Sequence, residues 1–287
     1  MILITGATGT NGREVVKQLT EVDKPVRVLV RDANKAKSLF APQVAIVVGD
    51  LEQPETLKAA LEGVERALLI PANSPNQLHQ ERNFIEAAQR AKVQHLVKFS
   101  ALGADIPDSP VSLLRWHAES EQILRGSGIP FTIIRPTTFM QNMLGSASTI
   151  KSEGKFYMAV GDARVAQVDA RDIAAVIITA LTQSGHEGKI YTVTGSEALT
   201  YTEVAEKLSS VLCKQISCVN ISLPEWNQAL VSAGMPQWFA DAMVGLQEHV
   251  TKPIGSQVTN TIAEVTKQQP ITFDQFAKDY AAAFRGN

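Results

Sequence analysis

Residues 2–19 read ILITGATGTNGREVVKQL, an apolar run followed by glycines at positions 6, 9 and 12 and then by a helical pattern. We expect a strand, a tight turn and a helix. Gly6 would turn the chain off the strand, Gly9 would let the backbone approach a ligand, and Gly12 would let the helix pack on the sheet. The unpaired N–H groups that begin such a helix suit a bound pyrophosphate. The stretch therefore predicts a dinucleotide-binding turn, with an ordinary turn as the alternative. The predicted contacts are Gly6, Thr8, Gly9, Thr10, Asn11 and Gly12.

Further apolar runs follow at regular intervals, with helical patterns between them. They cover residues 25–30, 44–48, 67–70, 95–100, 131–136 and 190–194. This alternation predicts a Rossmann-type α/β fold, a doubly wound parallel sheet, and argues against a barrel. Thr200 and Glu203 have the spacing of a capping box that starts a helix. We expect residues 1–154 to bind NAD(P), residues 165–195 to return to that sheet, and residues 196–287 to form a smaller α+β substrate lobe.

Composition argues against nucleic-acid-binding, membrane and metal-binding functions. The 287 residues carry a formal charge of −2, which gives no electrostatic reason to expect nucleic acid or an anionic membrane as a partner. No apolar run approaches the roughly 18 residues of a membrane span, and Met1 leads directly into the first strand, so we expect a cytoplasmic protein. The two cysteines and five scattered histidines suggest reduced structural thiols and no metal site.

The end of the second run bears on the choice of cofactor. Arg31 precedes Asp32 there, and Lys35 follows one helical turn later. An acidic residue at this place binds the ribose 2′-OH of NAD, whereas an arginine accommodates the 2′-phosphate of NADP. The order favours NADP(H), and Asp32 keeps NAD(H) as an alternative. Arg31, Lys35 and Lys37 are also compatible with a solvated charge cluster at a helix start.

The pattern Thr5-Gly6-Ala7-Thr8-Gly9-x-x-Gly12 resembles the NmrA-like, atypical branch of the short-chain dehydrogenase/reductase superfamily. That family contains quinone, triphenylmethane dye and isoflavone reductases as well as redox-sensing regulators. The resemblance implies that the third strand ends beside the adenine and the fifth at a catalytic serine position. In parallel sheets ligands lie at the carboxyl ends of strands, so the loop after the fourth strand should also border the cofactor. The residues concerned are Asp50 and Leu51, then Ile70, Pro71 and Ala72, and finally Ser100.

The chain departs from the family's standard catalytic pair. Where the resemblance places Tyr-x-x-x-Lys, the sequence has Leu113 and His117, so the usual proton donor is missing. The run His117-Ala118-Glu119-Ser120-Glu121 is similar to the His-x-Glu-Thr-Glu pattern of quinone reductases of the family. We therefore take His117 as a catalytic candidate whose titration would appear near pH 6 to 7. A purely structural histidine is the alternative.

The segment after the sixth strand resembles the family's passage into the substrate lobe. Phe139 and Met140 are predicted to pack on the nicotinamide and substrate, and Gln141 and Asn142 to orient them by hydrogen bonds. The alternative is the buried start of a helix.

Two functions fit these observations. The first is an NADPH-dependent reductase of an electrophilic, planar small molecule such as a quinone or dye, which accepts hydride without a strong acid because the developing charge is delocalised. The second is an NADP(H)-sensing regulator without turnover. A homodimer is compatible with either.

Overall fold

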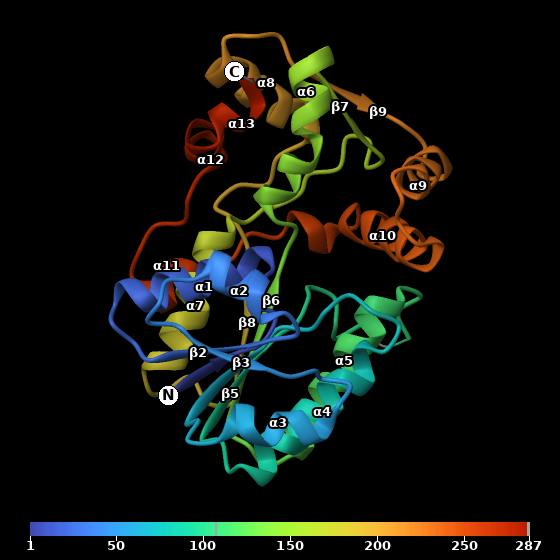
Figure 1. Cartoon of the computed structure of the whole chain (residues 1–287). Helices are drawn as coiled ribbons and strands as arrows, with labels where there is room; N and C mark the ends of the chain where they lie inside the picture. Colours follow the sequence, from blue (N-terminus) through green and yellow to red (C-terminus); the bar gives the residue numbers. More distant parts are fainter. Residues whose placement is uncertain (107, 286–287) are drawn as a thin grey trace. The chain divides into compact units, whose positions relative to one another are not determined.

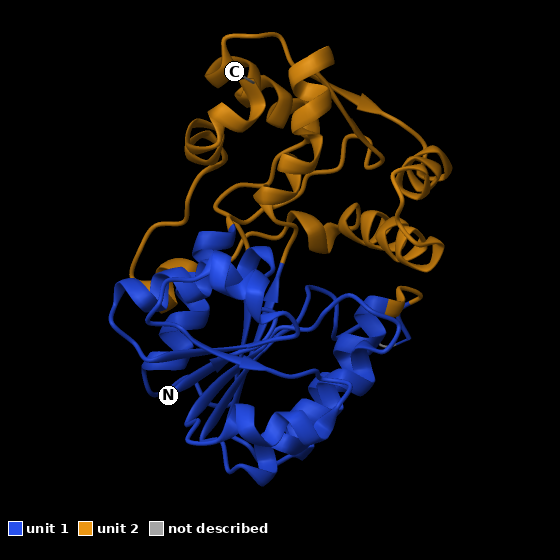
Figure 2. Ribbon diagram, viewed as in Figure 1, with its two compact units in different colours: residues 1–109, 113–136, 170–192 blue, residues 110–112, 137–169, 193–287 orange. Residues whose placement is uncertain are grey.

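A computed structural model describes residues 1–106 and 108–285 (Figure 1). The chain divides into two compact units (Figure 2). Unit 1 comprises residues 1–109, 113–136 and 170–192, and unit 2 comprises residues 110–112, 137–169 and 193–287. None of the helices in the described part of the chain is long and apolar enough to cross a membrane.

Unit 1 is built on a seven-stranded sheet. Its strands are β1 (Ile2–Ile4), β2 (Val26–Val30), β3 (Ala45–Val48), β4 (Arg66–Leu69), β5 (His95–Phe99), β6 (Phe131–Pro136) and β8 (Lys189–Val193), in the order β3-β2-β1-β4-β5-β6-β8. The neighbours from β3 to β6 pair in parallel, and Ile4 on β1 lies opposite Val28 and Leu68. The strand order reverses between β1 and β4, which is where doubly wound sheets bind ligands. The predicted Rossmann-type fold is confirmed.

Helices cover both faces of this sheet (Figure 1). They are α1 (Thr10–Glu21), α2 (Ala33–Leu39), α3 (Pro54–Leu61), α4 (Gln77–Arg90), α5 (Ser112–Gly126) and α7 (Ala170–Thr182). On one face, Leu57 of α3, Phe84 of α4 and Leu124 of α5 share a core with Leu96 and Ile133 of the strands. On the other, α1 packs along α7. Helix α7 has no counterpart among the sequence predictions.

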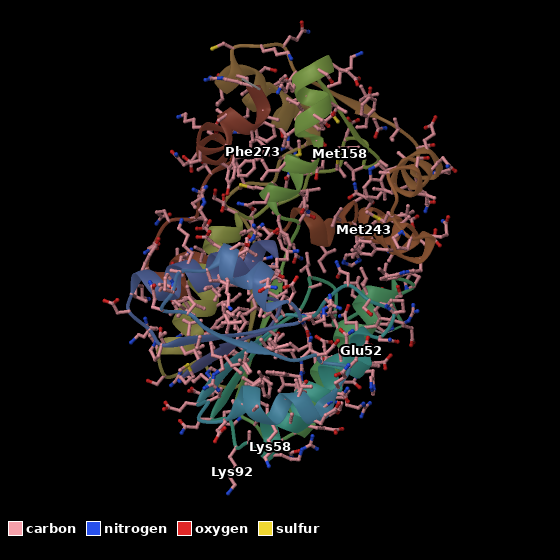
Figure 3. The ribbon with its side chains drawn as sticks, viewed as in Figure 1. Glu52, Lys58, Lys92, Met158, Met243 and Phe273 are labelled. Carbon is pink, nitrogen blue, oxygen red and sulfur yellow. The ribbon has the colours of Figure 1, made fainter. Side chains whose placement is uncertain are left out.

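Unit 2 is mainly helical. Its elements are η1 (Met140–Ser146), α6 (Ala147–Glu153), β7 (Lys155–Met158), α8 (Tyr201–Leu212), β9 (Ser217–Asn220), α9 (Leu223–Ser232), α10 (Gln237–Val250), η2 (Pro253–Ser256), α11 (Thr261–Thr266), α12 (Phe273–Asp279) and α13 (Ala281–Arg285). Strands β7 and β9 form a parallel pair. Phe273 lies in the core and Met158 packs against it (Figure 3). The capping box of Thr200 and Glu203 is confirmed at the start of α8.

The predicted domain boundaries need correction, because the chain leaves unit 1 after Pro136 rather than after residue 154. The backbone N–H of Thr137 bonds to the carbonyl of Val193, and its hydroxyl donates to the carbonyl of Ala166 over 2.5 Å. Met143 and Ile150 are then buried in the core of unit 2. Residues 137–154, 165–169 and 193–195 therefore belong to unit 2, since their partners lie there.

Candidate cofactor and active site

Three glycines of the turn after β1 meet different surroundings. Gly6 has a φ of +60°, and a Cβ there would lie 2.8 Å from the Cβ of Ile70. A Cβ on Gly12 would lie 2.2 Å from the carbonyl oxygen of Gly6, so only glycine lets α1 pack on the turn. At Gly9 a Cβ would meet only the Gly6 carbonyl, at 3.4 Å. The fold therefore requires Gly6 and Gly12, whereas Gly9 leaves space beside the turn.

A side chain at the end of β1 joins this turn to the end of β4. The hydroxyl of Thr5 accepts from the N–H of Ile70 over 2.9 Å and donates to the carbonyl of the same residue over 3.1 Å. Ile70 and Pro71 are half-buried and Ala72 is exposed, so the loop after β4 stands next to the glycine turn. The structure thus brings two of the predicted cofactor segments together.

The start of α1 has the features of an anion site. Helix geometry leaves the first N–H groups, at Thr10, Asn11 and Gly12, outside the intrahelical ladder. Gly9 at the N-cap offers no side-chain acceptor for them, and Gly9 and Thr10 are exposed, with Thr8 half-buried. The Oδ1 atom of Asn11 is buried with no partner among the described residues. These groups fit a bound dinucleotide, whose pyrophosphate would accept from the N–H groups.

The different surroundings of Gly9 and Gly12 give a matched pair of variants. Gly9→Val should fold, because Gly9 is exposed and a Cβ there makes only one ordinary contact, but it should weaken binding of either nicotinamide cofactor at least about tenfold, or about 1.4 kcal/mol. Gly12→Val should instead lower thermal stability, because its Cβ overlaps the Gly6 carbonyl. Calorimetric titration and thermal unfolding separate the two effects. A folded Gly9→Val protein with wild-type affinity would mean that the cofactor does not use this turn.

The end of β2 carries the predicted ribose residues. Arg31 and Lys35 are exposed. Asp32 is the N-cap of α2, and its carboxylate accepts from the N–H groups of Asn34 and Lys35 over 2.9 and 3.0 Å. Its carboxylate is thus engaged in the helix cap, whereas the cations of Arg31 and Lys35 remain available for a 2′-phosphate.

The loop after β3 is tied to α4. The carboxylate of Asp50 accepts from the N–H of Glu52 over 3.0 Å, and the carbonyl of Leu51 accepts from the amide of Asn83 over 2.8 Å. Glu52, labelled in Figure 3, accepts from the amides of Gln80 and Asn76, and these hydrogen bonds lower its pKa. Both predicted adenine contacts therefore lie on an anchored loop. The anchor Glu52 was not predicted.

Ser100 at the end of β5 is part of a buried ion-pair network. Its hydroxyl donates to Oε1 of Glu121 on α5 over 2.6 Å. The guanidinium of Arg135, on β6, donates to both oxygens of the same carboxylate over 2.9 and 2.6 Å and also reaches Asp105 over 2.8 Å. Burial by itself would lower the pKa of Arg135, but the hydrogen bonds and charges of Glu121 and Asp105 raise it.

This network changes the interpretation of Ser100. The serine is buried, and its proton is already committed to Glu121. The predicted catalytic and cofactor-binding roles of Ser100 stay predictions, and donation to a ligand would first require its hydroxyl to leave Glu121. The geometry gives Ser100 a structural part in joining β5 to α5.

His117, on α5, faces a buried cation. Its Nδ1 atom lies 3.4 Å from Nζ of Lys98 on β5, and that ammonium is paired with Oε1 of Glu81 on α4 at 2.5 Å. The pKa of His117 is held well below its usual value, first by burial and then by the charge of Lys98. His117 is therefore neutral at pH 7, and the titration near pH 6 to 7 expected from the sequence is corrected. Leu113, at the position of the family's tyrosine, is buried in the core.

The residues after β6 lie in unit 2. Met140 and Gln141 are buried, and the amide of Gln141 donates to the carboxylate of Asp169 over 2.9 Å. Both therefore lie at the buried start of η1, as in the alternative interpretation of this segment, and their predicted substrate contacts stay predictions. Phe139 is half-buried and Asn142 is exposed, so their predicted roles stay open.

The two buried ion pairs were not predicted, although both strands that carry their cations were. Lys98 and Arg135 each interrupt an otherwise apolar run that the fold buries. A charged side chain in such a run needs a buried partner, and this was the signal that could have pointed to Glu81 and Glu121.

Comparison with known proteins is consistent with this geometry. A family model described as NAD(P)H-binding matches residues 6–184. The NAD(P)H azoreductase of Xenophilus azovorans is 43% identical over 284 residues, which cover 99% of both chains. The chain belongs to the NmrA-like short-chain dehydrogenase/reductase family. The protein is an NAD(P)H-dependent oxidoreductase.

Two solved structures extend the comparison. The NADPH-dependent quinone oxidoreductase of Escherichia coli, complexed with NADPH, is 32% identical and superposes with a TM-score of 0.88 over 98% of this chain and 100% of its own. The triphenylmethane reductase of Citrobacter sp., complexed with NADP(H), is 27% identical with a TM-score of 0.86 over 97% and 99%. The fold of this family member is thus shared along both units.

Proposed function

We propose that the protein is a reductase that prefers NADPH and transfers hydride to a planar, electrophilic small molecule such as a quinone or an azo or triphenylmethane dye. The relatives named for these substrates support the substrate class. The observation that carries the proposal is the buried His117, which faces the ammonium of Lys98, with the apolar Leu113 one helical turn before it at the tyrosine position. Such a site lacks the acid that a simple ketone needs, and a delocalised acceptor does not depend on one.

Each part of unit 1 has a task in this proposal. The N–H groups at the start of α1 hold the pyrophosphate, Arg31 and Lys35 hold the 2′-phosphate, and the loops after β3 and β4 border the rest of the cofactor. Bound NADPH supplies the hydride. The chain's own contribution is to orient the reactants and to exclude water. We also expect the protein to act in the cytoplasm, on its small-molecule substrate and without a nucleic-acid partner.

His117 is the proposed polar contact of the substrate. A neutral imidazole keeps one N–H, which donates a hydrogen bond to an oxygen or nitrogen that gains negative charge during reduction. The residue acts in this way by stabilising charge rather than by releasing a proton. Its contribution should therefore not change across the ordinary histidine titration range.

The test is His117→Ala, with the buried His95→Ala as the matched control. We expect His117→Ala to lower kcat about tenfold or more, because one preorganised donor is lost, and to leave the Kd for NADPH nearly unchanged. The wild-type rate should be flat between about pH 6 and 8, since His117 stays neutral there. His95→Ala, which breaks the contact to Thr132, should affect stability alone. Equal turnover in His117→Ala would assign that residue to packing.

The alternative is an NADP(H)-sensing protein without turnover, which the buried Leu113 at the tyrosine position also suits. Consumption of bound NADPH distinguishes the two functions. A sensor would bind the cofactor tightly and leave it unchanged in the presence of quinones and dyes.

A further inference from the structure

We propose that Lys98 is a positioning residue that holds His117 in a single tautomer, with the proton on Nε2 and the lone pair of Nδ1 directed at the ammonium. The effect on turnover rests on the proposed function of His117, whereas the tautomer itself does not. Lys98 does not act on the substrate directly, because its side chain has no exposed surface.

The surroundings of the Lys98 ammonium decide which atom donates in its hydrogen bond with His117. Nζ of Lys98 has three acceptors, which are Oε1 of Glu81 at 2.5 Å, the carbonyl of Phe99 at 3.4 Å and Nδ1 of His117 at 3.4 Å. An ammonium carries three donors and no lone pair. Nδ1 must therefore accept, and the single proton of the neutral ring is placed on Nε2.

The neighbouring charges keep the ring in this form. Glu81, from α4, neutralises Lys98, and its Oε2 atom has no further partner among residues 1–106 and 108–285. Glu121, one turn beyond His117 on α5, is bound by Arg125 and by Arg135 of β6. Each carboxylate near the ring is thus paired with a cation. His117 faces the ammonium instead of a carboxylate, so an imidazolium would have no counter-ion there.

The arrangement leaves one ring atom for a ligand. Nε2 of His117 has no hydrogen-bond partner among the described residues. It carries the proton in the tautomer that Lys98 selects, so the site presents a donor of fixed position whose protonation does not vary near neutral pH. Loss of the ammonium would let the ring adopt the other tautomer, in which Nε2 is an acceptor and cannot stabilise negative charge.

The test compares the wild type with Lys98→Met/Glu81→Leu. The double change removes both charges, whereas Lys98→Met by itself would leave the carboxylate of Glu81 buried and unpaired. Ring ¹⁵N NMR of the free protein reports the tautomer of His117 without any substrate. We expect Nε2 protonated and no titration near pH 6.5 in the wild type, and mixed tautomers with a pKa moved upward in the variant. Turnover should fall about tenfold with the Kd for NADPH unchanged, because the donor is no longer held in place.

The control is Thr132→Val, which removes the buried contact between Thr132 and His95. It should change the His95 resonances and stability but leave the His117 resonances and the pH profile as they are. A wild-type His117 protonated on Nδ1, one that titrates near 6.5, or a double variant with unchanged His117 resonances would overturn the proposal. If the double variant does not fold, the wild-type resonances decide it. If the tautomer is as expected but His117→Ala turns over normally, the role of Lys98 stands and the proposed role of His117 falls.

Discussion

Replacement of Glu121 by alanine is expected to lower the free energy of unfolding by about 3 to 5 kcal/mol, because it leaves a buried guanidinium without its main partner. Arg135 donates twice to Glu121, and the remaining contact, with Asp105, lies at the exposed end of the network. The hydroxyl of Ser100 loses its acceptor in the same step. Urea unfolding of wild type and variant measures the difference.

Two further variants show whether the expected loss of unfolding free energy comes from leaving a buried charge unpaired or merely from losing an ion pair. Glu86→Ala breaks the exposed pair with Arg90 at 3.8 Å and should cost no more than about 0.5 kcal/mol. Glu121→Ala/Arg135→Leu removes the unpaired cation and should recover part of the loss. A Glu121→Ala protein as stable as Glu86→Ala would show that the network contributes no more than a surface ion pair.

Arg31→Ala is expected to weaken NADPH binding about ten to a hundredfold and to leave NADH binding almost unchanged. Only NADPH carries the 2′-phosphate, and a charge-assisted hydrogen bond contributes roughly 1.5 to 3 kcal/mol. The preference of the wild type for NADPH should shrink as salt rises, because Arg31 is exposed and its charge is screened. Titration of both proteins with both cofactors measures the effect.

Two neighbours provide the controls for Arg31. Lys37 is an exposed cation on α2, and Lys37→Ala should leave both affinities as they are if the effect is specific to Arg31. Asp32→Ala removes the N-cap and should destabilise α2 by about 1 kcal/mol without changing the ratio of the affinities. A wild type that binds both cofactors equally, or an Arg31→Ala protein that loses both in proportion, would assign the ribose to Asp32.

The fold was predictable because its signals are local. The glycine spacing and apolar runs identified the strands of the main sheet, and the capping box identified the start of α8, since each pattern involves residues close in sequence. The boundary at Pro136 was not predictable in this way. Thr137 leaves the sheet because of its bonds to residues 166 and 193, which no local pattern reveals.

In the candidate site, too, features set by residues close in sequence were predictable and features set by distant residues were not. The roles of Gly6 and Gly12 follow from backbone geometry and were readable from their spacing. The protonation state of His117 depends on Lys98, nineteen positions earlier in the chain and on another element, and its burial depends on the packing of α5. The bond from Ser100 to Glu121 was not predicted for a similar reason, because Glu121 lies on the next helix. The protonation and hydrogen bonding of His117 and Ser100 therefore depend on residues that only the tertiary structure brings close to them.

Rapid mixing of the protein–NADPH complex with a quinone or an azo dye, in the absence of oxygen, tests the proposed reductase most directly. We predict that NADPH is oxidised in step with reduction of the acceptor over many turnovers, faster than with NADH. We also predict that Gly9→Val slows the reaction at a cofactor concentration near the wild-type Kd, because the variant binds the cofactor at least about tenfold more weakly. Tight binding of NADPH without its oxidation by any quinone, azo dye or triphenylmethane dye would contradict the account.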